Sequence, residues 1–168
     1  MARLKPLPAV WLVSDERNDA MLETALRKLP RGSGFIFRHY HLDGPDRRAR
    51  FVVLARKARA RGHLVALAGS PALARRWDAD FAYGPCGDLV PVHSLREIGR
   101  ASQAAALVLS PAFATRSHPG AKPLGPLRFR LLAFRASKPV IALGGMNPRA
   151  SRRLGWACWA AIDGLTRP

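Results

Sequence analysis

The side chains best suited to chemistry lie in a loop late in the chain. The loop follows the apolar run 106–109, which is flanked by turn residues and is typical of a strand buried on both faces. Hydroxyl, imidazole and cationic groups then stand on a proline and glycine frame: Ser110, Thr115, Arg116, Ser117, His118 and Lys122. This composition suits an anion, and parallel α/β folds bind ligands at the carboxyl ends of their strands. The alternative is a surface loop that is basic because the whole chain is basic.

A second strand-like run ends in two adjacent glycines. Residues 139–143 are mostly apolar, Gly144 and Gly145 follow, and Asn147 and Pro148 are typical of a helix start. Glycines let backbone N–H groups approach a phosphate closely, and a helix N-terminus adds its dipole. Beside the first loop, this segment predicts that Gly144 and Gly145 contact a phosphate.

Length and composition indicate one domain with a core. The chain has 168 residues, of which 48% are hydrophobic, so disorder is not expected. Lys and Arg number 28 against 11 Asp and Glu, and the net charge of +17 suits anionic partners such as phosphorylated substrates or nucleic acid. Most basic residues, Arg152 among them, fall on polar faces of expected helices without an RNP-like motif. Nucleic-acid binding is therefore the lesser alternative.

The cysteines and the N-terminus favour a cytoplasmic protein. Cys86 and Cys158 show no metal-ligand spacing and are expected to be reduced thiols. The apolar run 9–13 is too short for a signal peptide, and no run is long enough to span a membrane.

Hydrophobic patterning predicts eight strands that alternate with helices. The strands are expected over 9–13, 34–40, 63–67, 81–83, 89–92, 106–109, 139–143 and 157–162. The helices are expected over 19–29, 45–61, 71–77, 94–105, 126–136 and 147–154. Residues 84–87 leave no room for a helix, and at most one turn follows the last strand. We therefore expect residues 1–168 to form a single α/β domain, a compact (β/α)8 TIM barrel whose fourth helix is missing and whose eighth is truncated. An open doubly wound sheet is the alternative.

Five segments carry a resemblance to a known family. They are Pro91–Glu97 (PVHSLRE), 110–118 (SPAFATRSH), 122–125 (KPLG), 139–147 (PVIALGGMN) and 155–164 (GWACWAAIDG). In order and spacing they resemble motifs of the thiamine phosphate synthase family, which includes the TenI-type thiazole tautomerases. The N-terminal half is similar more loosely.

The resemblance implies a (β/α)8 barrel and one of two activities. The family's synthase joins a pyrimidine pyrophosphate to a thiazole phosphate with Mg²⁺, whereas its tautomerases bind the thiazole phosphate and move a proton to make the ring aromatic. The positions that match the family's ligand contacts are Gly144, Gly145, Ala161 and Ile162 for the phosphate, and Thr115 and Ser117 for the hydroxyl pair of the sixth loop.

The chain departs from the family on the second strand and in the sixth loop. Where the family has Gln, Arg and Lys on its second strand, this chain has Ile36, Arg38 and Tyr40, so only the arginine remains. We expect Arg38 either to contact an anion or to form a buried ion pair with Asp15. The sixth-loop lysine is replaced by His118, which is either a phosphate or carboxylate contact or a plain loop residue.

The synthase's metal-binding acids are missing. Gly69 and Ala72 stand where the family has acids after its third strand, and residues 84–87 replace the acidic loop after its fourth. Because Mg²⁺ needs carboxylates, we expect no metal site and no cofactor, with Mg²⁺ required only if the chain is an active synthase. Tautomerisation needs only a phosphate anchor and one acid–base group that titrates near neutral pH.

His93 fits that acid–base role. It follows the fifth expected strand, and the matching position in TenI-type proteins is a histidine with this function; the alternative is a structural histidine that caps the next helix. His39 and His41 flank Tyr40, and strand alternation places both on one face, toward either the pocket or the outer wall.

The leading hypothesis is a barrel that binds thiazole phosphate at its carboxyl-terminal face and transfers a proton through His93. A synthase that also takes the pyrimidine pyrophosphate, a catalytically silent binding or regulatory protein, and a nucleic-acid-binding protein are the alternatives. The sequence leaves a homodimer open.

Overall fold

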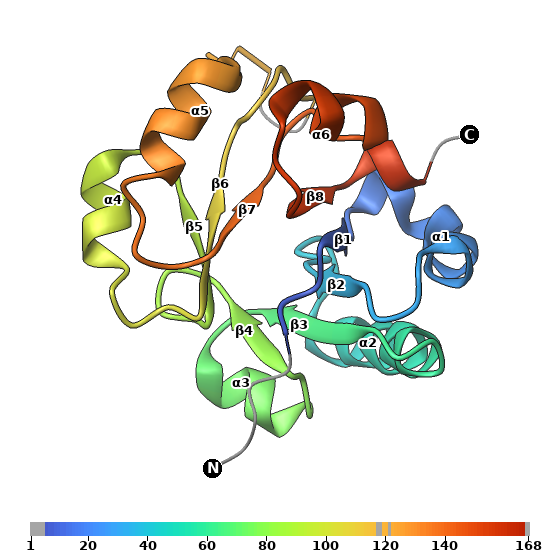
Figure 1. Cartoon of the computed structure of the whole chain (residues 1–168). Coiled ribbons are helices and arrows are strands. Elements are labelled where there is room, and N and C mark those ends of the chain that lie inside the picture. Colours follow the sequence, from blue (N-terminus) through green and yellow to red (C-terminus); the bar gives the residue numbers. More distant parts are fainter. Residues whose placement is uncertain (1–5, 117–118, 121, 167–168) are drawn as a thin grey trace.

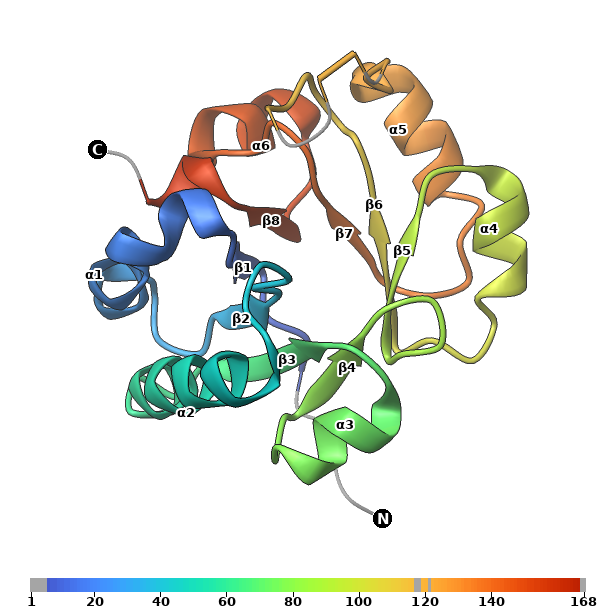
Figure 2. The same ribbon diagram turned by 180° about the vertical axis from the view of Figure 1, so that it is seen from behind.

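A closed barrel of parallel strands forms the centre of the molecule (Figure 1). The computed structural model describes residues 6–116, 119–120 and 122–166. Within them, eight strands pair in chain order from β1 to β8, and β1 also pairs with β8 to close the ring. The helices form an outer layer around the strands, which Figure 2 shows from behind. The predicted (β/α)8 barrel is therefore confirmed, and the open doubly wound alternative is wrong.

The strands are β1 Val10–Val13, β2 Gly34–Phe37, β3 Leu64–Ala68, β4 Phe81–Tyr83, β5 Leu89–Val92, β6 Ala106–Leu109, β7 Val140–Ala142 and β8 Trp159–Ala161. The α-helices are α1 Leu22–Lys28, α2 Gly44–Arg59, α3 Pro71–Arg76, α4 Leu95–Arg100, α5 Gly125–Ala133 and α6 Pro148–Leu154. The described residues also form two 3-10 helices, η1 Glu16–Met21 and η2 Asp163–Leu165. In the part of the chain that the structure describes, no helix is both long and apolar enough to cross a membrane.

The two shortened connections are confirmed. Strands β4 and β5 are joined by a tight turn in which a Cβ at Gly87 would collide with the carbonyl group of Ala82. Among the described residues after β8, which end at Thr166, the chain makes the 3-10 turn η2. With these two short segments, the (β/α)8 barrel closes with fewer residues than usual.

Trp11 fills the barrel interior near its amino-terminal end. Its side chain is fully buried, and its indole Nε1 donates to the carbonyl oxygen of Pro8 at 2.8 Å. Gly34 is its register partner on β2, and any side chain there would overlap the indole. The interior at this end of the barrel is therefore packed.

Strand β2 is shorter than predicted, which corrects the placement of the two histidines after it. The strand ends at Phe37, and His39 has a left-handed backbone with φ +35°. Strand alternation therefore does not extend to His39 and His41. His39 is buried, whereas His41 is exposed, and neither lines the large cavity described below.

Candidate functional site

A cavity of about 990 Å³ opens at the carboxyl-terminal end of the barrel. Its wall comes from the segments after β5, β6, β7 and β8, together with residues that follow or end β2 and β4. The predicted site residues that line it are Arg38, His93, Thr115, Gly144, Gly145, Ala161 and Ile162. The other two, Ser117 and His118, lie outside the described residues. The structure thus brings together every predicted site residue that it describes.

The glycine pair after β7 is required by packing. Gly144 and Gly145 have φ values of +97° and +61°, a region that L side chains rarely adopt. A Cβ at Gly144 would lie 2.8 Å from the Cα of Pro111, and one at Gly145 would lie 2.8 Å from the Cβ of Phe113. The loops after β6 and β7 also exchange backbone hydrogen bonds, such as that from Phe113 N to Gly144 O at 3.0 Å. The two loops therefore form one rigid wall of the cavity.

The imidazole of His93 is oriented by the loop after β6. Its Nδ1 lies 2.9 Å from the carbonyl oxygen of Ser110 and 3.2 Å from the hydroxyl of the same residue. A carbonyl oxygen only accepts hydrogen bonds, so Nδ1 carries the proton in the neutral ring and Nε2 is left with a lone pair. Among the described residues, no group is hydrogen-bonded to that Nε2.

Helix α4 is capped without the His93 ring. The Ser94 hydroxyl accepts from the backbone N–H of Glu97, and the Glu97 carboxylate accepts from the backbone N–H groups of Ser94 and His93. This is a capping box, and it uses only the main chain of His93. The alternative of a structural histidine that caps the helix is therefore wrong for the side chain.

Arg38 forms the expected ion pair with Asp15 and also lies on the cavity wall. Its Nη2 donates to the Asp15 carboxylate at 2.8 Å, and its Nε donates to the Ser14 carbonyl at 3.3 Å. The side chain is 14% exposed and also lines the cavity. Arg17 and Arg38 hold the pKa of Asp15 below its usual range although burial opposes them, so this carboxylate stays charged beside the guanidinium.

Three of the cavity side chains that sequence reasoning missed can donate hydrogen bonds to a ligand. Arg149 and Arg152 stand three residues apart on α6 and both line it, although Arg152 was expected on a solvated face. Their (i, i+3) spacing after Pro148 places them on one side of the helix, which was the available signal. Tyr83, at the end of β4, is the third; burial raises the pKa of its phenol, which therefore stays protonated and able to donate.

The charge of the cavity favours anions. Among the described residues that line it, the cations are Arg38, Arg116, Arg149 and Arg152. The carboxylate among them is Asp163, whose Oδ2 lies 3.7 Å from Arg17 Nη1. This excess of guanidinium groups gives the concave wall a positive potential, which suits anionic groups.

The donor set does not fit Mg²⁺. Asp163 is the lining carboxylate and already pairs with Arg17. Asp88, the carboxylate nearest to the missing acidic loop, accepts from the backbone N–H of Ala82 at 2.7 Å and serves the β4–β5 turn. Within the described ranges, no cluster of three or more His, Cys, Asp or Glu side chains is placed to hold a metal. Mg²⁺ prefers several oxygen ligands, which this cavity does not offer among those residues.

Comparison with known proteins gives a likeness of fold. No family model and no curated protein matches the sequence. Among solved structures, a thiamine phosphate pyrophosphorylase from Pyrococcus furiosus matches with a TM-score of 0.74 and 21% sequence identity. The match covers 92% of this chain and 85% of that chain. The two proteins share a fold, so the resemblance seen in the sequence is confirmed at the level of the fold.

Proposed function

We propose that this chain binds a small phosphorylated thiazole at the carboxyl-terminal face of its barrel and transfers a proton through His93. One observation carries the proposal: the Ser110 carbonyl fixes the His93 ring so that Nε2 is the basic atom, in a cavity that also holds the glycine pair and four arginines. An oriented base beside an anion-binding wall is what a proton transfer on a phosphorylated substrate requires.

The chemistry is an isomerisation that balances without a co-substrate. Nε2 of His93 takes a proton from one ring atom of a non-aromatic thiazole tautomer. The imidazolium that forms keeps its Nδ1–H on the Ser110 carbonyl. It then returns a proton to another atom of the ligand, and the product ring is aromatic. The donor set described above offers no metal site for this step, and the step needs none.

The phosphate would be held by three kinds of group. Backbone N–H groups at Gly144 and Gly145 and near Ala161 and Ile162 are the first, and the Thr115 hydroxyl is the second. The arginines of the cavity supply the positive charge, which strengthens hydrogen bonds to a phosphate. Each contributes to binding the unreacting part of the ligand and so to its orientation above His93.

The second candidate is a synthase that couples a pyrimidine pyrophosphate to the thiazole phosphate. The name of the Pyrococcus furiosus structure favours it, and the cavity of about 990 Å³ is large enough for two small ligands. The poor donor set for Mg²⁺ opposes it, because departure of a pyrophosphate relies on cationic stabilisation by the metal. A silent phosphate-binding protein is the third outcome of the experiment below.

Substitution of His93 tests the proposal. We expect the wild-type chain to convert the non-aromatic thiazole phosphate to its aromatic tautomer, followed by ultraviolet absorbance. His93→Gln and His93→Ala should lower kcat by about 100-fold or more, since general acid–base catalysis contributes at that scale. Calorimetry should show that both variants still bind the phosphorylated product.

Arg152→Gln is the matched contrast to the His93 variants. It should weaken binding of the ligand and raise KM, with a smaller effect on kcat, because it removes a charge that contacts the phosphate rather than the reacting ring. Ligand binding by the wild type without turnover would identify a silent binder. Mg²⁺-dependent coupling of the two precursors would identify a synthase instead.

A further inference from the structure

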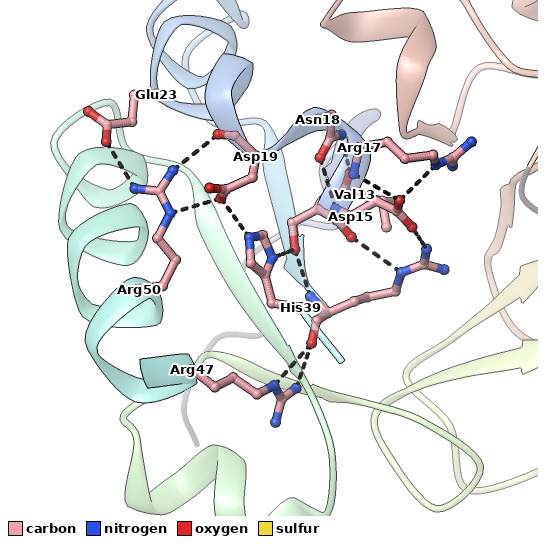
Figure 3. Close-up of polar contacts among 11 residues, drawn as sticks. Val13, Asp15, Arg17, Asn18, Asp19, Glu23, His39, Arg47 and Arg50 are labelled. Carbon is pink, nitrogen blue, oxygen red and sulfur yellow. Dashed lines mark hydrogen bonds and ion pairs between the residues drawn. The ribbon is translucent and has the colours of Figure 1, made fainter. Parts of the chain in front are cut away.

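A chain of hydrogen bonds beside the cavity, buried at Ser14 and His39, has no role in the function proposed above. It joins Asp19 of η1, His39 after β2 and Ser14 after β1 (Figure 3). His39 Nε2 lies 2.6 Å from Asp19 Oδ1, and its Nδ1 lies 2.8 Å from Ser14 Oγ. His39 is 1% exposed and Ser14 is fully buried.

The direction of each hydrogen bond follows from its chemistry. The Asp19 carboxylate only accepts, so His39 donates through Nε2–H and its Nδ1 accepts from the Ser14 hydroxyl. The Ser14 oxygen in turn accepts from the backbone N–H of Arg38 at 2.8 Å. The far end is fixed by Arg50 of α2, whose Nε donates to the same Asp19 oxygen at 2.8 Å. The chain therefore runs from an ion pair on the outer helix to the main chain of Arg38.

These residue types match a hydrolase triad, but the geometry does not support nucleophilic attack. Ser14 is fully buried, and its oxygen already accepts from Arg38 N–H while it donates to His39. The hydroxyl cannot approach a substrate without breaking both bonds. We therefore look for the role of these hydrogen bonds in the segment that they hold in place.

The hydrogen bonds of Asp19, His39 and Ser14 hold the segment after β2, from which Arg38 reaches the cavity wall. The Arg38 N–H is fixed by Ser14, and the Arg38 carbonyl accepts from Arg47 Nε at 3.1 Å and Nη2 at 2.8 Å. Arg47 Nη2 also donates to the carbonyl of Ala68 at the end of β3. The Arg38 main chain is thus tied on both sides to neighbouring elements of the barrel.

The His39 backbone shows that this arrangement is imposed. Its φ of +35° is unusual for a residue other than glycine and follows Arg38 directly. The ring is stacked on Phe37, with centroids 4.6 Å apart and planes 8° apart, and hydrogen-bonded at both nitrogens. Because the imidazole is held by Phe37, Ser14 and Asp19, the backbone at His39 keeps its left-handed turn. The position of His39 therefore sets the direction in which the Arg38 side chain leaves the end of β2.

We propose that His39 is a positioning residue for the anion pocket: together with Ser14 and Asp19 it fixes Arg38 where its guanidinium meets a phosphate or pyrophosphate group of the ligand. The inference rests on the proposed function only in taking the cavity to bind an anion. It adds three residues that no contact with the ligand would reveal.

Two substitutions of His39 separate its two hydrogen bonds. His39→Asn keeps an acceptor near the position of Nδ1 for Ser14 and tolerates the left-handed backbone. His39→Gln keeps a donor that reaches Asp19 but leaves Ser14 without its acceptor. We expect calorimetry with inorganic pyrophosphate to show that His39→Gln raises Kd by about 10-fold or more, and that His39→Asn raises it by less than about 3-fold. Ser14→Ala should behave like His39→Gln and serves in its place if that variant does not fold.

An Arg38→Met background tests whether His39 acts through Arg38. We expect Arg38→Met to weaken pyrophosphate binding, and His39→Gln added to it to cause no further loss, because the two effects share one path. Equal losses with and without Arg38, or equal effects of the Asn and Gln variants, would overturn the inference. Failure of the wild type to bind pyrophosphate would overturn the anion pocket as well. Absence of proton transfer with these binding differences intact would remove the proposed function alone.

Discussion

At the scale of single residues, the turn after β7 depends on a side chain being absent. Gly145 has a φ of +61°, and a Cβ there would meet Phe113 and the carbonyl oxygen of Ala114. We expect Gly145→Ala to lower the free energy of unfolding by about 2 kcal/mol, because it adds backbone strain to a clash with a rigid loop. Urea unfolding followed by tryptophan fluorescence measures the change. Pyrophosphate affinity should fall too, since the cavity wall must shift.

Gly99 provides the matched control. It lies inside α4, and a Cβ there would meet nothing within 4 Å. Gly99→Ala should leave stability unchanged or raise it by up to about 1 kcal/mol, as expected for glycine in a helix interior. Equal losses in the two variants would show that the conformation of Gly145 is not what the turn requires.

Sequence reasoning placed some residues of the candidate site and not others, for physical reasons. The apolar run 89–92 placed His93 at the end of a strand, and His93 lies on the wall of the cavity at the carboxyl-terminal end of the barrel. His39 could not be placed, because the alternation argument assumes that the strand continues, and its left-handed φ leaves no trace in composition. Arg152 was hidden by its charge, since a cation on a short helix is usually solvated.

At the scale of elements, the junction between β5 and α4 depends on a cap. Helix α4 has only six residues, and the Ser94 hydroxyl accepts from the N–H of Glu97 in its first turn. We expect Ser94→Ala to lower the free energy of unfolding by about 1 kcal/mol, whereas Ser94→Gly should lower it by a few tenths, as for N-cap residues in general. Urea titrations of the two variants measure the difference. Identical losses would mean that the cap hydroxyl contributes nothing at this junction.

The strands were easier to predict than the helices. The run 106–109 and its counterpart 89–92 match β6 and β5 residue for residue, because buried parallel strands are short and wholly apolar. The helix expected over 94–105 ends at Arg100 instead. Its alanine-rich end reads as helical, yet the N–H groups of Ala105 and Ala106 both donate to the Asp88 carbonyl next to β5. Tertiary pairing therefore overrides local propensity there.

At the scale of the whole molecule, barrel closure followed from counting strands, whereas the distribution of charge did not. Eight strand–helix units predict a ring because each unit adds one strand in order. The net charge of +17 gives no indication of where cations gather, and four arginines meet in one cavity only after closure brings the strand ends together. The concentration of positive charge at this face is thus a property of the closed fold.

Two buried histidines link the stability of the whole molecule to pH. Burial lowers the pKa of His39, and the hydrogen bond and charge of Asp19, which act in the opposite direction, do not restore it. Burial also lowers the pKa of His63, whose Nε2 donates to the Leu26 carbonyl at 2.9 Å. The Nδ1 atom of His63 is buried and has no partner among the described residues, so a proton there would have no acceptor.

We therefore expect the free energy of unfolding to fall between pH 7.5 and pH 5.5. The unfolded chain gains protons on these histidines as the pH passes below about 6.5, while the folded chain resists them, so the loss continues down to the folded pKa values. Each histidine that stays neutral contributes up to about 1.4 kcal/mol of loss at pH 5.5. Asp15, Asp19 and Glu23, whose pKa values are lowered, act at lower pH, near and below pH 4.5, where their protonation adds a further loss of stability.

Urea titrations at pH 7.5 and pH 5.5 measure the change in the free energy of unfolding. His63→Gln, which keeps a donor for the Leu26 carbonyl, should remove about half of this change. An unchanged pH dependence in that variant would contradict the assignment of His63.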